Sequence, residues 1–428
     1  MLGAFVSALK VPDLRRKILF TLFVILIYRI GSHVPVPGID FEAAQKLTQS
    51  TGGVLGLLNL FSGGALTQMA VFALGIMPYI TSSIIMQLLT VVIPRLEQWS
   101  KEGEVGQKKI TQWTRYLTVG LAILQSTGLT FLFHRGGLRD AQNNAVDLIP
   151  NFTPPRVALI VLTLTAGTAL IMWFGELISQ RGIGNGMSIV IFASIVSSLP
   201  SEGLTILRQR GWVWFGVILA LGVLIIVAIV IVEQGQRRIP VQYARRQVGR
   251  RMLGGQSTFI PLKVNQAGVI PIIFASSFLY IPALLATVVQ WRPLRDFIDR
   301  HLANQASPVY ITLYALLIVA FAFFYTAISF NPVDVADNMK KYGGFIPGIR
   351  PGNATAHHLD FILTRITLPG ALFLASVAIL PSIALALLRV QAFPFGGTSV
   401  LITVGVALET MKQLEAQLLQ RHYEGFLR

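Results

Sequence analysis

The sequence predicts an all-α polytopic membrane protein with ten transmembrane helices, and two observations favour this class. The chain is 53% hydrophobic and only 13% charged, with a mean hydropathy of +0.64. Its hydrophobic residues gather in charge-poor segments, and a spanning helix needs about 20 such residues. The chain contains no Cys, which excludes disulfides, thiol catalysis and cysteine-ligated metals.

The first span is expected at Ile18–Val34, directly after a basic N-terminal segment. Arg29 lies near its outer end, where a long side chain can snorkel to the interface or pair with another group. Pro35, Pro37 and Gly38 then end the helix.

The stretch Leu47–Pro94 runs for 48 residues without Asp, Glu, Lys or Arg, yet it is not uniformly apolar. A polar, glycine-broken patch at Asn59–Gln68 precedes the strongly apolar run Met69–Ile93. Three arrangements fit this pattern: one span with a loop, two spans joined by a tight turn, or a short half-helix followed by a full span.

The distribution of basic residues favours a single crossing. If Leu47–Pro94 crosses once, 24 of the 35 Lys and Arg residues lie on the side of the N-terminus and 10 lie on the other. Two crossings would place 13 with the N-terminus and 21 opposite, against the rule that basic loops stay cytoplasmic. Asn59–Gln68 then lies on the outer side, packed in protein or lining a water-filled cavity.

Eight further charge-poor segments bring the predicted total to ten spans and place both termini in the cytoplasm. They are Tyr116–His134, Val157–Gly175, Gly182–Ser201, Gly211–Val232, Val264–Trp291, Leu302–Val333, Ile366–Leu388 and Val390–Leu408. Five spans on each side of the loop Glu233–Lys263 favour an inverted repeat, because an odd number of spans reverses the topology of the second half.

Two cytoplasmic loops are long and basic, Glu233–Lys263 and Asp334–Arg365. Topogenic charge and attraction to anionic lipid explain single arginines. The interleaved apolar residues Ile239, Val241 and Ile260 instead favour a folded docking surface, with arginine pairs presented from a short hairpin. The candidate docking residues are Arg245, Arg246, Arg250, Arg251, Lys340, Lys341 and Arg350.

Two apolar pairs have the four-residue spacing of one helix face, Ile76 with Ile80 and Met187 with Ile191. Core packing explains such pairs in most proteins. Because Gly and Pro lie beside both pairs, a hydrophobic gate that closes by excluding water is the alternative.

Enzyme and carrier functions find little support. The six His residues and the acids at span ends form no metal-ligand or paired-carboxylate spacing, so no catalytic residue and no metal are expected. A secondary transporter with inverted repeats is the alternative function, but the carboxylates that mark ion paths are missing from the span centres.

Long motifs resemble the SecY family, the central subunits of bacterial protein-conducting channels. Val71–Leu89 is similar to that family's signature around the second span, and Trp173–Ile191 to its second signature. Shorter motifs similar to those of the family occur in the family's order along nearly the whole chain. They are Asn59–Gly64, Lys101–Glu104, Gly268–Pro271, Ala336–Lys341, Pro347–Gly352 and Phe395–Ser399.

The resemblance implies two pseudosymmetric five-helix halves around an hourglass pore. The N-terminal half would cover residues 1–200, span 6 and the basic loop residues 201–263, and the remaining spans residues 264–428. A plug half-helix would fall at about Leu57–Gln68 and include Leu60, Phe61, Ser62, Gly63 and Gly64.

The resemblance also assigns roles to residues. The pore ring would comprise Ile76, Ile80, Met187, Ile191, Ile273 and Ile402, with Met187 a departure from the branched aliphatic residue expected there. The lateral gate, between spans 2 and 3 and spans 7 and 8, would have Thr81, Gln125 and Ile281 near its seam.

The implied function is passage of unfolded preproteins across the cytoplasmic (inner) membrane and lateral release of membrane segments. The basic loops would bind the ribosome and the motor ATPase SecA, and the small subunits SecE and SecG would brace the helices. Signal peptides, preproteins and anionic lipid complete the expected partners, and no cofactor is expected.

Overall fold

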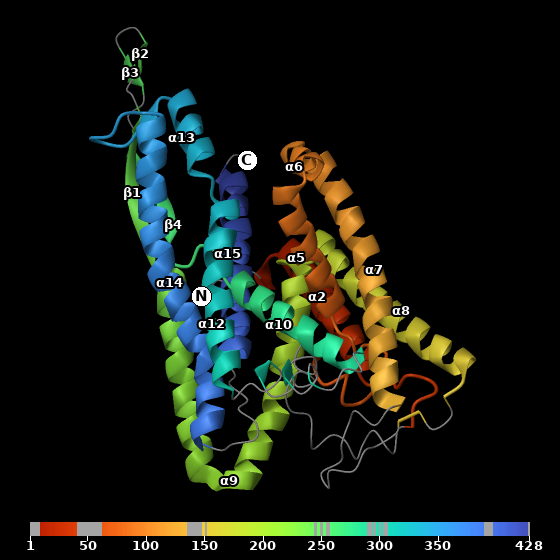
Figure 1. Cartoon of the computed structure of the whole chain (residues 1–428). Helices are drawn as coiled ribbons and strands as arrows, with labels where there is room; N and C mark the ends of the chain where they lie inside the picture. Colours follow the sequence, from red (N-terminus) through yellow and green to blue (C-terminus); the bar gives the residue numbers. More distant parts are fainter. Residues whose placement is uncertain are drawn as a thin grey trace.

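The computed structural model describes residues 9–40, 62–134, 148–149, 152–243, 246–248, 251–253, 257–288, 293, 297–298, 301–302, 307–388 and 397–426. Within these ranges the chain forms long helices in two groups, and one helix of the second group, α10, reaches across to the first (Figure 1). α10 contacts α5 and α7 of the first group and α12 and α14 of the second.

The first group derives from the N-terminal part of the chain. It contains α2 (Pro12–Gly31), α5 (Met77–Val92), α6 (Pro94–Lys101), α7 (Glu104–His134) and α8 (Pro154–Arg181). Four of these helices have Pro in their first turn. Backbone N–H groups in the first turn have no partner within the helix, so Pro, which lacks an N–H, loses no hydrogen bond there. α5 and α6 meet at a bend of 101° beside Pro94, so α6 leaves the direction of the preceding span.

The second group follows α9 (Gly186–Gln234). It contains α10 (Ile270–Val288), α12 (Pro308–Ser329), α13 (Pro332–Lys341), α14 (Asn353–Leu388) and α15 (Gly397–Phe426). α15 packs against α9, and α14 packs against α12.

Spans 5 and 6 are joined differently from the sequence-based expectation, which placed a loop between Ser201 and Gly211. α9 contains Pro200 in its interior and reverses its course through a crosswise segment at its base (Figure 1). The backbone stays helical until Gly211, where φ is +81° and ψ is 178°. Only Gly adopts such angles readily, so this residue lets two helices meet without a separate loop.

The second span is also shorter than Met69–Ile93. Residues from Gly63 to Ile76 form successive turns, and the helix begins only at Met77. The left-handed φ values of Met69 (+48°) and Gly75 (+58°) interrupt any helix in this stretch.

The basic loop after α9 folds into the predicted hairpin. β1 (Gln236–Tyr243) pairs antiparallel with β4 (Ser257–Lys263) from Gln236 opposite Lys263 to Gln242 opposite Ser257. Short strands β2 (Arg246–Val248) and β3 (Arg251–Leu253) pair at the distal end of the hairpin. The hairpin projects beyond the helices beside α13 (Figure 1).

The second basic loop adds a strand to the same sheet. β5 (Gly344–Phe345) pairs with the end of β1, and the strand order is β4-β1-β5. The inward residues of β1, Ile239 and Val241, pack in an apolar cluster with residues of the second loop, including Met339 and Ile346. The two loops therefore form one folded unit.

The membrane class is supported by helix length and composition. Among the described residues five helices are long and apolar enough to span a membrane, or six if the bent pair α5 and α6 counts as one span. Gly186–Pro200 and Ile270–Leu279 are shorter apolar helices. Each of the ten predicted segments contains helix, while the number of crossings stays a prediction.

The first and last helices of the described part of the chain, α2 and α15, contact each other near one end of the molecule. Lys17 Nζ donates a hydrogen bond to Gln417 Oε1 at 3.4 Å, and Leu14 packs in one apolar cluster with Leu414. The start of α2 and the later turns of α15 therefore lie at the same end.

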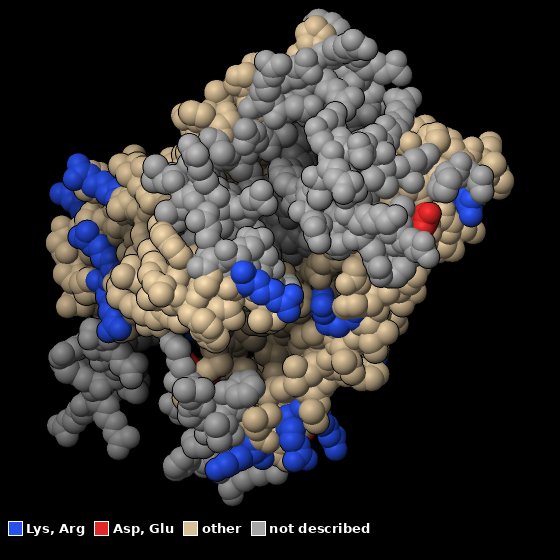
Figure 2. Space-filling view, turned by 90° about the horizontal axis from the view of Figure 1, so that it is seen from below, with Lys and Arg blue, Asp and Glu red and all other residues tan. Residues whose placement is uncertain are grey.

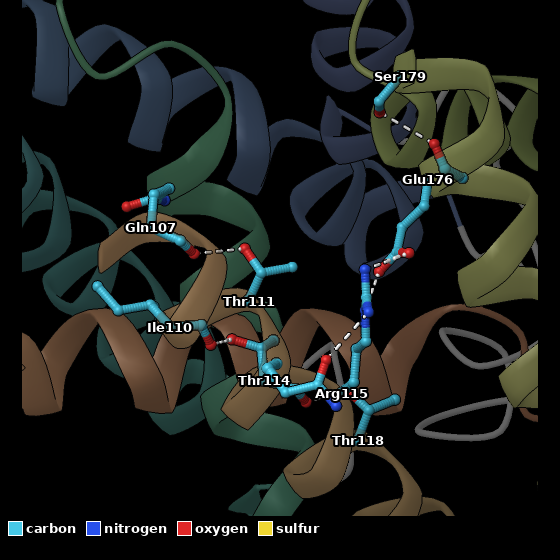
Figure 3. Close-up of polar contacts among 10 residues, drawn as sticks. Gln107, Ile110, Thr111, Thr114, Arg115, Thr118, Glu176 and Ser179 are labelled. Carbon is cyan, nitrogen blue, oxygen red and sulfur yellow. Dashed lines mark hydrogen bonds and ion pairs between the residues drawn. The ribbon is translucent and has the colours of Figure 1, made fainter. Parts of the chain in front are cut away.

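One charged pair joins two neighbouring helices of the first group. Arg115 of α7 donates from Nε and Nη2 to the two carboxylate oxygens of Glu176 in α8, at 2.7 and 2.8 Å (Figure 3). Its Nη1 donates to Gln112 Oε1 at 3.1 Å. The Glu176 side chain is only 17% exposed, so this paired geometry compensates the loss of water around its charge.

Removing this pair should destabilise the protein. We expect Arg115→Met to lower the free energy of unfolding by about 1–3 kcal/mol, because a half-buried carboxylate loses a charged donor. Thermal unfolding in detergent measures the effect. Lys108→Met is the matched control on α7, since it breaks a pair with Glu104 in which both side chains are at least 75% exposed. That control should cost less than about 1 kcal/mol. Equal effects of the two substitutions would contradict the prediction.

Candidate functional site

The turn before α5 directs two isoleucines into the protein interior. Left-handed Gly75 reverses the backbone, and Pro78 occupies the first turn of the helix. Ile76 and Ile80 are then 1% and 7% exposed, one helical turn apart. Both belong to one large cluster of buried apolar side chains.

The start of α9 is positioned by a cap and a close helix crossing. Asn185 Oδ1 accepts hydrogen bonds from the backbone N–H groups of Met187 (3.1 Å) and Ser188 (3.4 Å). A Cβ on Gly186 would lie 1.9 Å from the carbonyl oxygen of Gly175 in α8, so only Gly permits this approach. Ile191 follows on the same helix and is buried in the cluster.

Met187 has a second neighbour besides the cluster. It is half-buried and packs against the cluster, and its thioether occupies the notch at Gly175, where a Cβ would lie 2.2 Å from Sδ. A long, unbranched side chain can reach this notch from α9, which a branched aliphatic residue cannot do as easily.

The other two predicted ring residues come from the second group of helices. Ile273 of α10 is 9% exposed and Ile402 of α15 is fully buried. Gly405 lies one turn after Ile402, and a Cβ there would lie 2.5 Å from Val269 Cγ1. This close contact brings the start of α10 against α15.

The structure thus brings all six predicted ring residues into one cluster from four helices. Five are buried members, and Met187 packs against them. Their side chains offer no charge and no hydrogen-bonding group, so an opening lined by them would bind neither water nor ions.

The predicted plug lies partly outside the described residues. Leu60 and Phe61 fall there, whereas Ser62, Gly63 and Gly64 lie in the turns that precede α5. Ser62 is fully buried, and its neighbour Gly63 has a left-handed φ of +64°. The predicted half-helix does not extend to Gln68, because the described backbone after Ser62 forms turns.

Two of the predicted lateral-gate residues are buried polar groups. Thr81 Oγ1 donates to Met77 O at 3.0 Å within α5. Gln125 of α7 is 3% exposed, and its Oε1 has no hydrogen-bond partner among the described residues. The side chain of Ile281 is outside the described set, although its backbone is part of α10. α5, α7 and α10 contact one another, so Thr81 and Gln125 belong to adjoining helices.

The predicted docking residues lie at the hairpin end where the structure describes them. Lys340 and Lys341 end α13, and both are exposed, as is Arg350. Arg245 and Arg250 fall outside the described residues, as do the side chains of Arg246 and Arg251 in strands β2 and β3. In β1, Arg238 lies 4.8 Å from the ring centroid of the exposed Phe259.

Basic side chains are distributed differently at the end of the molecule opposite the hairpin. Viewed from the end at which α9 bends, the described basic side chains lie at separate places and form no continuous patch (Figure 2). Arg208 is one exposed basic residue of the α9 bend.

Sequence reasoning missed one polar junction at the base of the hairpin. Asn265 Nδ2 donates to Glu233 Oε1 at the end of α9 and to the carbonyl of Gly268 before α10. A single acid at a span end and a single Asn after a strand are too common to indicate this contact.

No group of three or more His, Asp or Glu side chains with metal-binding geometry occurs in the part of the chain that the structure describes. The side chains of the large apolar cluster carry no charge, which suits them to exclude ions.

Comparison with known proteins identifies relatives over the whole chain. A family model described as SecY matches residues 70–411. The protein translocase subunit SecY of Streptomyces scabiei is 58% identical over 440 aligned residues that cover both chains completely.

Solved structures share the fold at low sequence identity. A SecY protein whose plug domain stabilises the closed state of the translocation channel and maintains a membrane seal has a TM-score of 0.64 and 18% identity, covering 94% of this chain and 92% of that one. Sec61 in the canine ribosome-channel complex from the endoplasmic reticulum has a TM-score of 0.59 and 18% identity, with the same coverage.

The crossing of α8 and α9 generates a prediction. Gly186→Ala would place a Cβ against the backbone carbonyl of Gly175, so we expect a loss of roughly 1–3 kcal/mol in unfolding free energy through overpacking. Gly120→Ala in α7 is the control, because no atom lies within 4 Å of a Cβ built there. The control should be neutral or stabilising by about 0.5–1 kcal/mol. Thermal unfolding in detergent distinguishes them, and a neutral Gly186→Ala would refute the close crossing.

Proposed function

This chain belongs to the SecY family, and we propose that it is the channel subunit through which unfolded preproteins cross the cytoplasmic membrane. It also releases hydrophobic segments laterally into the bilayer. The chain is a passive conduit, and partners on the cytoplasmic side supply the energy by pushing or by synthesis.

The observation that carries this proposal is that five of the six predicted ring residues belong to one large apolar cluster and the sixth, Met187, packs against it. In the proposed channel these side chains form the narrowest point of the pore. Because they make no hydrogen bonds, they cannot retain a passing peptide. They deform around side chains of different size, and the empty constriction is too narrow and apolar to hold water.

The turns around Ser62–Gly64 would add a second barrier as the described end of the plug. The burial of these turns supports the assignment, since the next residues Ala65, Leu66 and Met69 belong to the same apolar cluster as the predicted ring residues. A likeness in fold to the SecY structure with a sealing plug is consistent with it.

The seam between α5 and α7 on one side and α10 and α12 on the other would serve as the lateral gate. A hydrophobic signal segment leaving through it gains about 25 cal/mol for each Å² of apolar surface removed from water. Thr81 and Gln125 give this seam a polar lining that a signal must replace.

The sheet of β1, β4 and β5 with α13 would bind the cytoplasmic partners, SecA and the ribosome. Exposed Lys340, Lys341 and Arg350 supply positive charge for nucleic acid, acidic protein or anionic lipid. SecE and SecG would brace the outer helices. The contact between α2 and α15 is consistent with both termini lying on that cytoplasmic side.

Reconstitution tests the function directly. The chain is placed in lipid vesicles with SecE and SecG, and SecA, ATP and a preprotein are added outside. Protease-protected preprotein inside the vesicles is the expected result. Its absence with active partners, under conditions in which a Streptomyces relative supports transport, would overturn the proposal.

The ring yields a prediction with a control on the same helix. We expect Ile402→Asn to raise the ion conductance of closed channels and to ease transport of preproteins with weak signals, since one amide gives water a partner in the constriction. Leu401→Asn is the control, because Leu401 is equally buried but lies in the other apolar cluster. Unchanged conductance in Ile402→Asn, or the same increase in both variants, would remove Ile402 from the ring.

The docking surface yields a second prediction about transport. We expect Arg350→Glu to reduce SecA- or ribosome-driven transport several-fold while the melting temperature stays within a few degrees, because this side chain is exposed. Arg208→Glu, at the opposite end of the molecule, should leave transport unchanged. Normal partner affinity in Arg350→Glu would exclude Arg350 from the docking surface.

A further inference from the structure

Arg29 is the only Asp, Glu, Lys or Arg between Ile18 and Val34, and neither the apolar cluster nor the docking surface uses it. Its Nη1 donates a hydrogen bond of 2.8 Å to the backbone carbonyl of Gly63. The guanidinium is therefore engaged with the turn segment before α5, rather than extended to the membrane surface.

The Tyr28 hydroxyl holds the adjacent peptide and is itself bonded to a second hydroxyl group. Tyr28 donates from its hydroxyl to Ser62 O at 3.1 Å and lies 2.6 Å from Ser194 Oγ of α9. Tyr28 and Ser194 are 1% and 0% exposed, so these bonds form away from water. The Tyr28 ring stacks on Phe72, with centroids 5.6 Å apart, which fixes the direction of its hydroxyl.

The backbone at Gly63 fits closely between the two helices. A Cβ at this position would lie 3.0 Å from Arg29 Nη1 and 3.1 Å from Ser194 Cα, and φ is +64°. Gly at this position both permits the left-handed turn and leaves room for the guanidinium.

The other end of the same segment is held in another way. Val36 N donates to Met69 O and Val71 N donates to Val34 O, each at 2.9 Å, and Pro35 bridges Ala70. Those backbone bonds require no particular side chain. The segment is thus fixed by main chain near α5 and by the side chains of Tyr28 and Arg29 near Ser62, with Ser194 supporting the Tyr28 hydroxyl.

We propose that Arg29, with Tyr28 and Ser194, is a positioning residue that holds Ser62 and Gly63 against α2 and α9 in the closed channel. This inference rests on the proposed function for its role in sealing. The three side chains form a releasable anchor. Arg29 and Tyr28 bond the segment to α2, and the Tyr28–Ser194 bond, which joins α2 to α9, breaks when these two helices separate. The bonds of Met69 and Val71 involve neither α9 nor any side chain.

The absence of Cys makes the anchor measurable with one reporter thiol. Ala65→Cys is suitable, because Ala65 is fully buried and belongs to no anchor bond. Its labelling by N-ethylmaleimide in vesicles holding the full chain requires local opening of the segment. We expect Arg29→Met in this background to raise the labelling rate at least about tenfold, because a charged donor is lost.

Three further variants complete the test. Tyr28→Phe keeps the ring stacking and removes the hydroxyl, and it should also speed labelling. Arg29→Lys keeps a cationic donor and should restore much of the protection. Arg156→Met is the control for loss of a half-buried basic side chain. Arg156 lies against Gly38, outside the anchor, so this substitution should leave the labelling rate unchanged.

Parental labelling rates in both Arg29→Met and Tyr28→Phe would overturn the anchor, as would an equal increase in Arg156→Met. If Arg29→Met does not accumulate in membranes, Tyr28→Phe and Ser194→Ala decide the question. Labelling does not require transport, so failure of the anchor and failure of the channel function give different results. Faster labelling with unchanged ion conductance would uphold the anchor and refute the sealing role.

Discussion

Contact among apolar side chains from four helices is the constraint on which the rest of the structure depends. α5, α9, α10 and α15 must each place a residue in one cluster, although they come from both groups of helices. Close crossings make this possible: Gly186 lies against Gly175, and Gly405 against Val269. Such contacts lack directional bonds, so they can separate and reform without leaving buried polar groups unpaired.

The irregular backbone before α5 is tolerated because its polar groups are satisfied inside the protein. In a bilayer, turns at membrane depth survive only when protein or an aqueous cavity surrounds them. Here the turns bond to one another, to Val34 and Val36, and to the side chains of Tyr28 and Arg29. The charge of Arg29 therefore has a structural partner, which accounts for a cation in a span that could otherwise be apolar.

Most helices could be predicted from the sequence, because charge-poor segments of fixed length are a strong and local signal. The single crossing of Leu47–Pro94 followed from charge distribution, and the turns before α5 are compatible with it. The helix through residues 201–210 could not be predicted, since Pro200 is typical of a helix end and the break at Gly211 is visible only in its torsion angles. The predicted ring residues share one cluster, but the notch at Gly175 that receives Met187 is a tertiary feature. The pairing of β5 with β1 joins loops about 100 residues apart in the chain, and a two-residue strand gives no sequence signal of its own.

The sheet and the apolar cluster are connected by a short path. β4 ends at Lys263 and α10 begins at Ile270, with Ile273 in its first turn. Between them Asn265 bonds both to Glu233 at the end of α9 and to Gly268, and Val264 N donates to Gly235 O. The base of the hairpin is thus fixed to the end of one helix and the start of another. Because Ile191 of α9 and Ile273 of α10 both belong to the large apolar cluster, the hairpin is joined to two of the helices that build this cluster.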